Sequence, residues 1–134
     1  MDDWRWPPEP PEDCPPAGAN AANGTYYRIV KSNPPNMQDF VPMYYENQSR
    51  AEKIAKDEKG TLCETMGLSV YSNIEHAVQC ANQYPKNGSI IAAVQIVPEC
   101  GKILQNPRMF DSHNTWWVVQ GFDPTTISEV VHQL

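Results

Sequence analysis

The stretch from Gly67 to Ala81 limits the fold most, because it predicts two different elements in direct succession. Residues 68–71 combine β-branched and aromatic side chains after a glycine, which is typical of a short strand. Ser72 and Glu75 have the spacing of a capping box and predict that a helix begins after the serine. The helix has one apolar stripe, formed by Ile74, Ala77, Val78 and Ala81. The sequence therefore predicts a strand that leads straight into a helix.

Further strands are expected on both sides of this unit. The helix should end at residues 84–88, where a proline and an Asn-Gly pair favour a turn. Residues 89–97 are the most apolar run of the chain and suit a central, buried strand. Other strand patterns cover residues 25–31, 102–104 and 115–120, a surface helix is expected at 50–59, and residues 127–134 fit either a helix or a strand. We therefore expect an α+β fold with a mixed, mostly antiparallel sheet of about five or six strands and two main helices.

Residues 1–24 differ in composition from the rest of the chain, with many prolines and acidic residues and few aliphatic ones. Such a segment buries too little apolar surface to offset its ordering entropy, so we expect a disordered, proline-rich acidic arm. Residues 25–134 are expected to form a single α+β domain. Trp4 and Trp6 stand out in the arm, because tryptophan side chains in a mobile segment are suited to docking on a protein partner.

Charge and hydropathy exclude several functional classes. The chain has a net charge of −6, and most of the excess negative charge lies in the arm. No basic cluster is present, so duplex nucleic acid is not an expected partner. No stretch approaches the roughly 20 apolar residues of a membrane helix, so no membrane association is expected. The N-terminus lacks the pattern of a signal peptide, and we expect a cytoplasmic location.

The four cysteines, Cys14, Cys63, Cys80 and Cys100, lack the paired spacing of a zinc site. Only three of them lie in the expected domain, so a disulfide framework is not expected either. The sequence therefore predicts free thiols and no metal.

Two polar residues are candidates for a site because of where they lie in the pattern. Arg28 shares a face of the strand at residues 25–31 with apolar neighbours. An arginine in this position lies either at the rim of a sheet or on the floor of an anion-binding cleft, and position alone favours the rim. His113 lies in a loop predicted over residues 106–114, and long loops in small domains often carry function. A purely structural or solvent-exposed histidine is the alternative there.

The order of these elements resembles the ADP-ribosyltransferase fold shared by bacterial toxins and poly-ADP-ribose polymerases. That family lines its NAD cleft with a strand of the form Gly-x-Ser and an alanine-bearing helix, and residues 67–71 (Gly-Leu-Ser-Val-Tyr) with Ala77 fit this form. The arginine of the family's first strand corresponds to Arg28. The chain is also similar to small uncharacterised bacterial proteins that begin with Tyr-Arg and end with Gly-x-Asp-Pro, as residues 27–28 and 121–124 do.

The resemblance implies a domain that binds NAD or a related nucleotide without a metal and transfers ADP-ribose in a toxin-like role. It implies catalytic roles for Arg28, Ser69 and Tyr71, with the arginine on phosphate or ribose and the serine on ribose or the carboxamide. The implied cofactor-binding residues are Arg28, Ser69, Tyr71, His113, Asn114 and Trp116. The family's catalytic glutamate has no counterpart in residues 112–116, where Asn and Thr supply hydrogen bonds but no countercharge.

The residues also favour a second function, namely a non-enzymatic protein-interaction module. In that case the arm and exposed aromatic side chains form the binding surface. The two hypotheses differ in geometry. Nucleotide binding requires Arg28, Ser69, Tyr71 and residues 111–116 to converge on one cleft, whereas an interaction module leaves them scattered and depends on residues 1–24.

Overall fold

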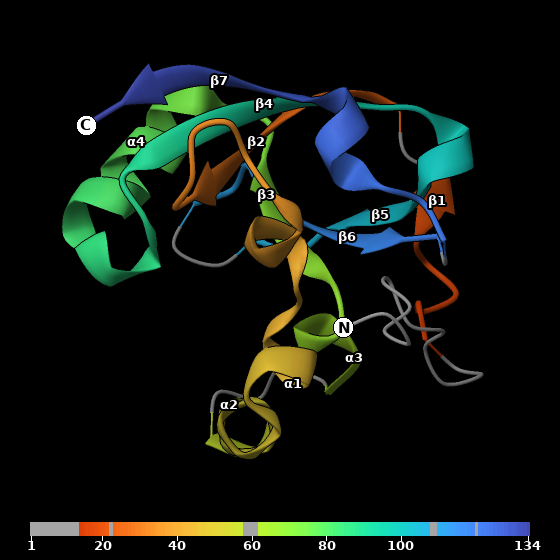
Figure 1. Ribbon diagram of the computed structural model, residues 1–134. Helices are drawn as coiled ribbons and strands as arrows, with labels where there is room; N and C mark the ends of the chain where they lie inside the picture. Colours follow the sequence, from red (N-terminus) through yellow and green to blue (C-terminus); the bar gives the residue numbers. More distant parts are fainter. Residues whose placement is uncertain (1–13, 22, 58–61, 108–109, 120) are drawn as a thin grey trace.

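The computed structural model describes residues 14–21, 23–57, 62–107, 110–119 and 121–134. Within these residues one sheet has the strand order β1-β5-β6-β3-β2-β4-β7, and all neighbouring strands are antiparallel (Figure 1). The strands are β1 (Asn20–Ala21), β2 (Gly24–Val30), β3 (Leu68–Tyr71), β4 (Ile90–Ile96), β5 (Gly101–Gln105), β6 (His113–Val118) and β7 (Ser128–Gln133). The α-helices are α1 (Met43–Glu46), α2 (Gln48–Asp57), α3 (Leu62–Thr65) and α4 (Ile74–Gln83). The predicted α+β class with a mostly antiparallel sheet is confirmed, although the described residues form more strands and helices than expected.

The strand–helix unit predicted around Gly67 is present as β3 and α4. The cap differs by one residue, because the side chain of Asn73, not that of Ser72, accepts a hydrogen bond from the Glu75 backbone N–H at 2.9 Å. Asparagine and serine are about equally good N-caps. The local sequence therefore allows both positions, and the end of β3 decides between them.

The two faces of the sheet carry separate apolar cores. The first core consists of Phe40, Leu68, Val70, Val94, Ile96, Cys100, Ile103, Trp116 and Val118. The second lies against α4 and consists of Tyr71, Ala77, Cys80, Ala81 and Ile91. Successive residues of a strand point to opposite faces, which is why the neighbours Val70 and Tyr71 belong to different cores. The strongly apolar β4, between β2 and β7, contributes to both.

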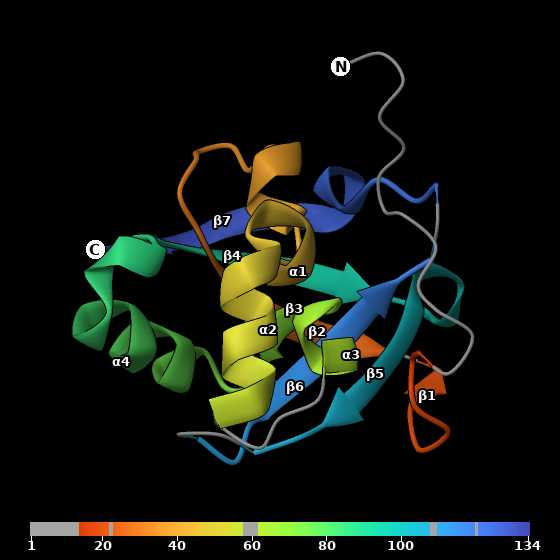
Figure 2. The same cartoon turned by 90° about the horizontal axis from the view of Figure 1, so that it is seen from below.

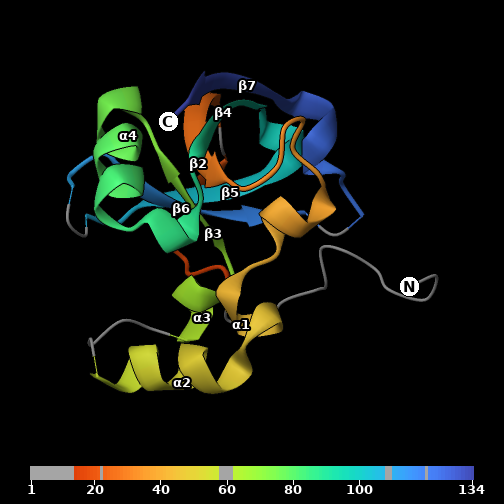
Figure 3. The same ribbon diagram turned by 60° about the vertical axis from the view of Figure 1, so that its left-hand side comes forward.

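Three α-helices lie between β2 and β3 in the described part of the chain. The helices α1, α2 and α3 lie together at the end of the molecule away from β7 (Figures 1 and 3). The middle helix α2 is the surface helix expected from the sequence, and it is mostly exposed apart from the fully buried Ala51. It begins at Gln48, and the side chain of Asn47 accepts from the Arg50 backbone N–H at 3.1 Å. Residue 59, the predicted end of this helix, lies outside the described residues.

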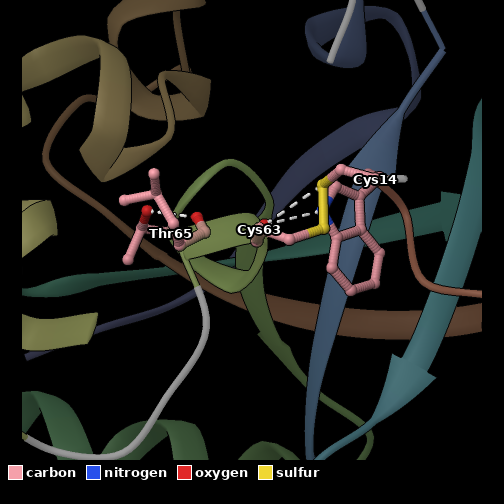
Figure 4. Close-up of a disulfide and its surroundings, with 5 residues drawn as sticks. Cys14, Cys63 and Thr65 are labelled. Atoms are coloured by element: carbon pink, nitrogen blue, oxygen red, sulfur yellow. Dashed lines mark hydrogen bonds between the residues drawn. A yellow bond between two sulfur atoms is a disulfide. The ribbon is translucent and has the colours of Figure 1, made fainter. Parts of the chain in front are cut away.

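The segment from Cys14 to Gly24 corrects two expectations. Cys14 forms a disulfide with Cys63 of α3, with the two Cα atoms 5.6 Å apart (Figure 4). Beyond it, Ala19 is buried and β1 pairs with β5 at the edge of the sheet (Figure 2). The described part of the predicted arm is therefore packed on the domain, and Cys14 and Cys63 are not free thiols. Residues 1–13, including both arm tryptophans, lie outside the described residues.

Two strands in the second half of the chain, β6 and β7, differ from or complete the expectation from the sequence. The C-terminal residues, which fitted either a helix or a strand, form β7 beside β4. The strand predicted from residue 115 begins at His113 instead, so His113 and Asn114 belong to β6 and not to a loop. Both positions pair with β3, and this pairing extends the strand beyond its apolar part. Among the described residues, no helix combines the length and the apolar character needed to cross a membrane.

Candidate functional site

Arg28 lies in an interior strand of the sheet, because β2 runs between β3 and β4. The rim position favoured by the sequence is therefore wrong. The guanidinium donates from Nε to the carbonyl oxygen of Asp39 and from Nη1 to that of Ser69, both at 2.8 Å. It also lies over the ring of Phe40, 5.8 Å from the centroid, which is within the range of a cation–π contact. Arg28 thus connects β2, the turn at residues 37–40 and β3.

The reach of Arg28 to Ser69 follows from the way β2 and β3 pair. The two strands share a single bridge, Tyr27 with Tyr71. The carbonyl of Ser69 lies beyond that bridge. It accepts a hydrogen bond from the Arg28 side chain, where a paired strand would supply a backbone N–H. Burial lowers the pKa of Arg28 to about 10, against the opposing effect of the nearby Asp39 and Glu46 carboxylates. The guanidinium therefore keeps its positive charge at neutral pH.

The hydroxyl of Ser69 forms the second contact of this residue. His113 Nε2 lies 3.0 Å from Ser69 Oγ, and His113 Nδ1 lies 2.9 Å from the carbonyl oxygen of Asn106. A carbonyl oxygen only accepts, so Nδ1 carries a proton. In the neutral imidazole, Nε2 is then the acceptor, and Ser69 is the donor. Ser69 and the two residues Asn106 and His113, which lie about 40 positions further along the chain, therefore form one directed chain of hydrogen bonds.

Tyr71 lies beside this chain on the face covered by α4. Its ring makes edge contacts with those of His113 and Phe110, at centroid distances of 5.5 and 6.3 Å. Its hydroxyl donates to the sulfur of Cys80 at 3.4 Å. Burial raises the pKa of Tyr71, and the hydrogen bond to Cys80 adds to this effect. The phenol is therefore neutral and fixed in position, although it interacts electrostatically with Arg28.

The site also includes four residues that sequence reasoning missed: His76, Asn106, Phe110 and Ser112. The ring of His76 stacks on Phe110 with 4.7 Å between centroids, and its Nδ1 lies 2.7 Å from Ser112 Oγ. Asn106 orients His113 as described above. These contacts join the start of α4 to the segment before β6, up to 36 residues apart. The sequence carries no local signal for them, because neither periodicity nor spacing relates positions so distant.

Asn114 and Trp116 do not join the cluster. Both differ from His113 by an odd number of residues along β6, so Asn114 projects to the other face, and Trp116 lies fully buried in the first core. Trp116 is therefore not available to stack on a ligand, which corrects that expectation. Its Nε1 is buried and has no hydrogen-bond partner among the described residues. Asn114 donates to the carbonyl of Ser112 at 2.9 Å and supports the turn before β6.

The structure thus brings together Arg28, Ser69, Tyr71 and His113, but not from a single face. The bridge between Tyr27 and Tyr71 puts these two side chains on the same face, so Arg28 leaves β2 on the opposite one. Its guanidinium meets the backbone of Ser69, while the serine hydroxyl meets His113. Ser69 is therefore bonded to both the charged Arg28 and the titratable His113. We call these four residues the Ser69 cluster.

Within the described residues, no group of three or more His, Cys, Asp or Glu side chains is arranged to hold a metal ion. No protein-family model, curated protein or solved structure matches this chain. The resemblance to ADP-ribosyltransferases consequently stays a prediction from the sequence.

Proposed function

We propose that the Ser69 cluster binds the ribose and phosphate groups of NAD or a related nucleotide. The observation that supports this is the double contact of Ser69, with Arg28 through its carbonyl and with His113 through its hydroxyl. Arg28, Ser69 and Tyr71, which the family resemblance assigns to catalysis, are neighbours: Ser69 and Tyr71 share one face of β3, and the guanidinium of Arg28 reaches Ser69 from the opposite face. A positive charge, a hydroxyl and aromatic rings are the groups that recognise a phosphorylated nucleoside.

The side chains in and beside the cluster have distinct parts in the proposed binding. Arg28 supplies charge, and its guanidinium has five N–H donors, two of which bond to the carbonyls described above. The exposed Ser69 supplies a hydroxyl oxygen that accepts from a ribose hydroxyl, since its own proton bonds to His113. The partly buried ring of Phe110, with His76 stacked on it, supplies an apolar wall for a flat ring system, and the buried Tyr71 contacts Phe110 at its edge.

Binding without transfer is the proposed form of this function. Transfer of ADP-ribose needs a negative group beside the ribose as nicotinamide leaves. At the start of β6, where the family has its glutamate, this chain has His113 and Asn114. Neither supplies a negative charge, so the proposed role is recognition of the nucleotide.

A thermal-shift titration with NAD tests this proposal. At an NAD concentration one hundred times the Kd, binding stabilises the folded state by about 2.7 kcal/mol and raises the melting temperature. S69A should reduce the shift, because it removes the hydroxyl. S72A replaces an exposed serine at the end of the same strand and should leave the shift unchanged. An absent shift in the unmodified protein, at millimolar NAD, contradicts nucleotide binding.

A protein-interaction module is the second proposal, and the position of Cys14 favours it. The disulfide to Cys63 holds this residue on α3, so residues 1–13, which contain Trp4 and Trp6, join the domain at a fixed point. Removal of residues 1–13 tests it. The proposal expects an unchanged melting temperature together with the loss of binding to a partner, and retained binding contradicts it.

A further inference from the structure

We infer that Ser69 is an activated nucleophile toward acyl-type electrophiles, with His113 as its general base. A serine hydroxyl is weakly nucleophilic unless a base is within hydrogen-bond reach and a third group orients that base. Ser69, His113 and the Asn106 carbonyl meet these conditions at 3.0 and 2.9 Å. This inference does not rest on nucleotide binding, and the experiment below contains no nucleotide, so either proposal can fail without the other.

The direction of the proton follows from the tautomer. The Asn106 carbonyl fixes the imidazole proton on Nδ1, so the lone pair of Nε2 faces the hydroxyl of Ser69. The histidine is only 6 % exposed, whereas the serine is exposed. The base is therefore shielded from water, and the nucleophile remains accessible to a substrate.

Asn106 is itself held in place from three sides, which makes it a positioning residue for His113. Its backbone N–H donates to the His113 carbonyl at 3.2 Å. Its side-chain oxygen accepts from the hydroxyl of Thr115 at 3.0 Å, and its side-chain nitrogen donates to a carboxylate oxygen of Glu64 at 3.2 Å. The carbonyl that orients the base is thus anchored to both β6 and α3. Fixed orientation of the base is what distinguishes a catalytic pair from a casual contact.

A second serine–histidine pair in the same region lacks access. His76 Nδ1 lies 2.7 Å from Ser112 Oγ, a shorter distance than that of the first pair. Ser112, however, is only 7 % exposed. An electrophile reaches Ser69 and not Ser112, so the inference concerns Ser69 alone.

The proposed step balances with water as the second reactant. Ser69 Oγ attacks the carbonyl carbon of an ester, and its proton passes to His113 Nε2. The new C–O bond forms as the bond to the alcohol breaks, and the leaving oxygen takes the proton from Nε2. Water then cleaves the acyl-serine by the same proton transfers, which releases a carboxylic acid.

Phenylmethylsulfonyl fluoride is the probe for this nucleophile. The serine oxygen displaces fluoride from sulfur and forms a stable sulfonyl ester, which peptide mass spectrometry assigns to a residue. We expect Ser69 in the native protein to react at least about tenfold faster than the exposed Ser72, since a positioned base gives about 10²–10⁴-fold. In urea the two serines should react equally, because unfolding separates Ser69 from His113.

The variant H113Q should reduce the rate at Ser69 to that at Ser72. Should this variant fail to fold, the comparison of native and urea-unfolded protein decides alone, because it needs no substitution. Equal rates at Ser69 and Ser72 in the native protein overturn the inference. So does an advantage of Ser69 that persists in urea or in folded H113Q.

Discussion

The guanidinium Nη1 of Arg28 donates to the carbonyl oxygen of Ser69 over 2.8 Å, beyond the single bridge that joins β2 to β3. The Arg28 side chain therefore supplies the hydrogen-bond donor for β3 at a position where the backbone of β2 does not pair with it. The same guanidinium holds the Asp39 carbonyl. Arg28 thus has a structural role in addition to the binding role proposed for it.

Replacement of Arg28 by methionine should lower the free energy of unfolding by about 2–4 kcal/mol. The methionine fills a similar volume but leaves two carbonyl groups without their donor, and each unsatisfied group costs about 1–3 kcal/mol. Urea denaturation followed by circular dichroism measures the loss. R50M is the matched control, because Arg50 is exposed on α2, and it should change stability by less than about 0.5 kcal/mol. Equal effects of R28M and R50M contradict the structural role.

Tyr71 should make the protein less stable in alkali. Its pKa is raised in the folded state, so above pH ~10 the unfolded chain loses this proton while the folded protein keeps it. Stability therefore falls as pH rises above ~10, with a slope that approaches about 1.4 kcal/mol per pH unit for this group. Arg28 has a lowered pKa and acts in the opposite direction, but it is present in both the wild type and Y71F.

Urea denaturation of the wild type and Y71F at pH 8 and pH 11 isolates the contribution of Tyr71. At pH 8 the wild type should be more stable, because its hydroxyl bonds to Cys80. The difference should shrink at pH 11. Parallel loss of stability in both proteins would mean that the tyrosine hydroxyl is not buried as described.

Gly101 should not tolerate alanine. Its φ is +133°, a conformation that side chains with a Cβ rarely adopt, and an added Cβ meets the backbone of Trp117. G101A should therefore lower the free energy of unfolding by about 3 kcal/mol or more. Gly18 is the matched control, because an added Cβ there lies 3.9 Å from Leu104 in ordinary contact. G18A should change stability by less than about 1 kcal/mol, and similar losses in both variants contradict the predicted difference.

The disulfide between Cys14 and Cys63 should contribute about 2–4 kcal/mol to stability, because it closes a loop of 49 residues. C14S, C63S and the double variant should lose the same amount, since each removes the same bond. Thiol titration in denaturant should find two reactive thiols, from Cys80 and Cys100, and four after reduction. Four thiols before reduction contradict the pairing. Structural disulfides are rare in the reducing cytosol, so this titration also bears on the cytoplasmic location, which stays a prediction from the sequence.

Local sequence patterns predicted most helices and strands. The order of the strands and the disulfide depend on pairing between distant residues, which these patterns do not reveal. The strand–helix unit of β3 and α4 follows from side-chain periodicity and capping, which act within a few residues. The interior position of Arg28 depends on the order of strands in the sheet. The alternation of side chains within β2 gives no information about that order. The pairing of Cys14 with Cys63 likewise spans 49 residues without a spacing signal.

For the same reason, only some residues of the candidate site could be named from the sequence. Ser69 and Tyr71 were named from the motif at residues 67–71 and Arg28 from its place in the first strand, and the three residues are neighbours. Trp116 was named as a cofactor-binding residue, yet it and its neighbour Trp117 are both buried, because both faces of β6 are covered. Alternation distinguishes the two faces of a strand, but it does not tell how many of them are covered. Asn106 and Phe110 became visible only through their contacts.

Isothermal titration calorimetry of NAD against the wild type, R28K and R50K tests the nucleotide proposal most directly. Lysine keeps the charge of Arg28 but not its directional fork, so R28K should weaken binding at least tenfold, or about 1.4 kcal/mol. R50K makes the same exchange at an exposed position of α2 and should bind NAD like the wild type. Circular dichroism and melting temperatures confirm that all three proteins are folded. Saturable binding to the wild type that R28K alone weakens is the predicted result, and no heat of binding to the wild type, or equal affinity of all three, contradicts it.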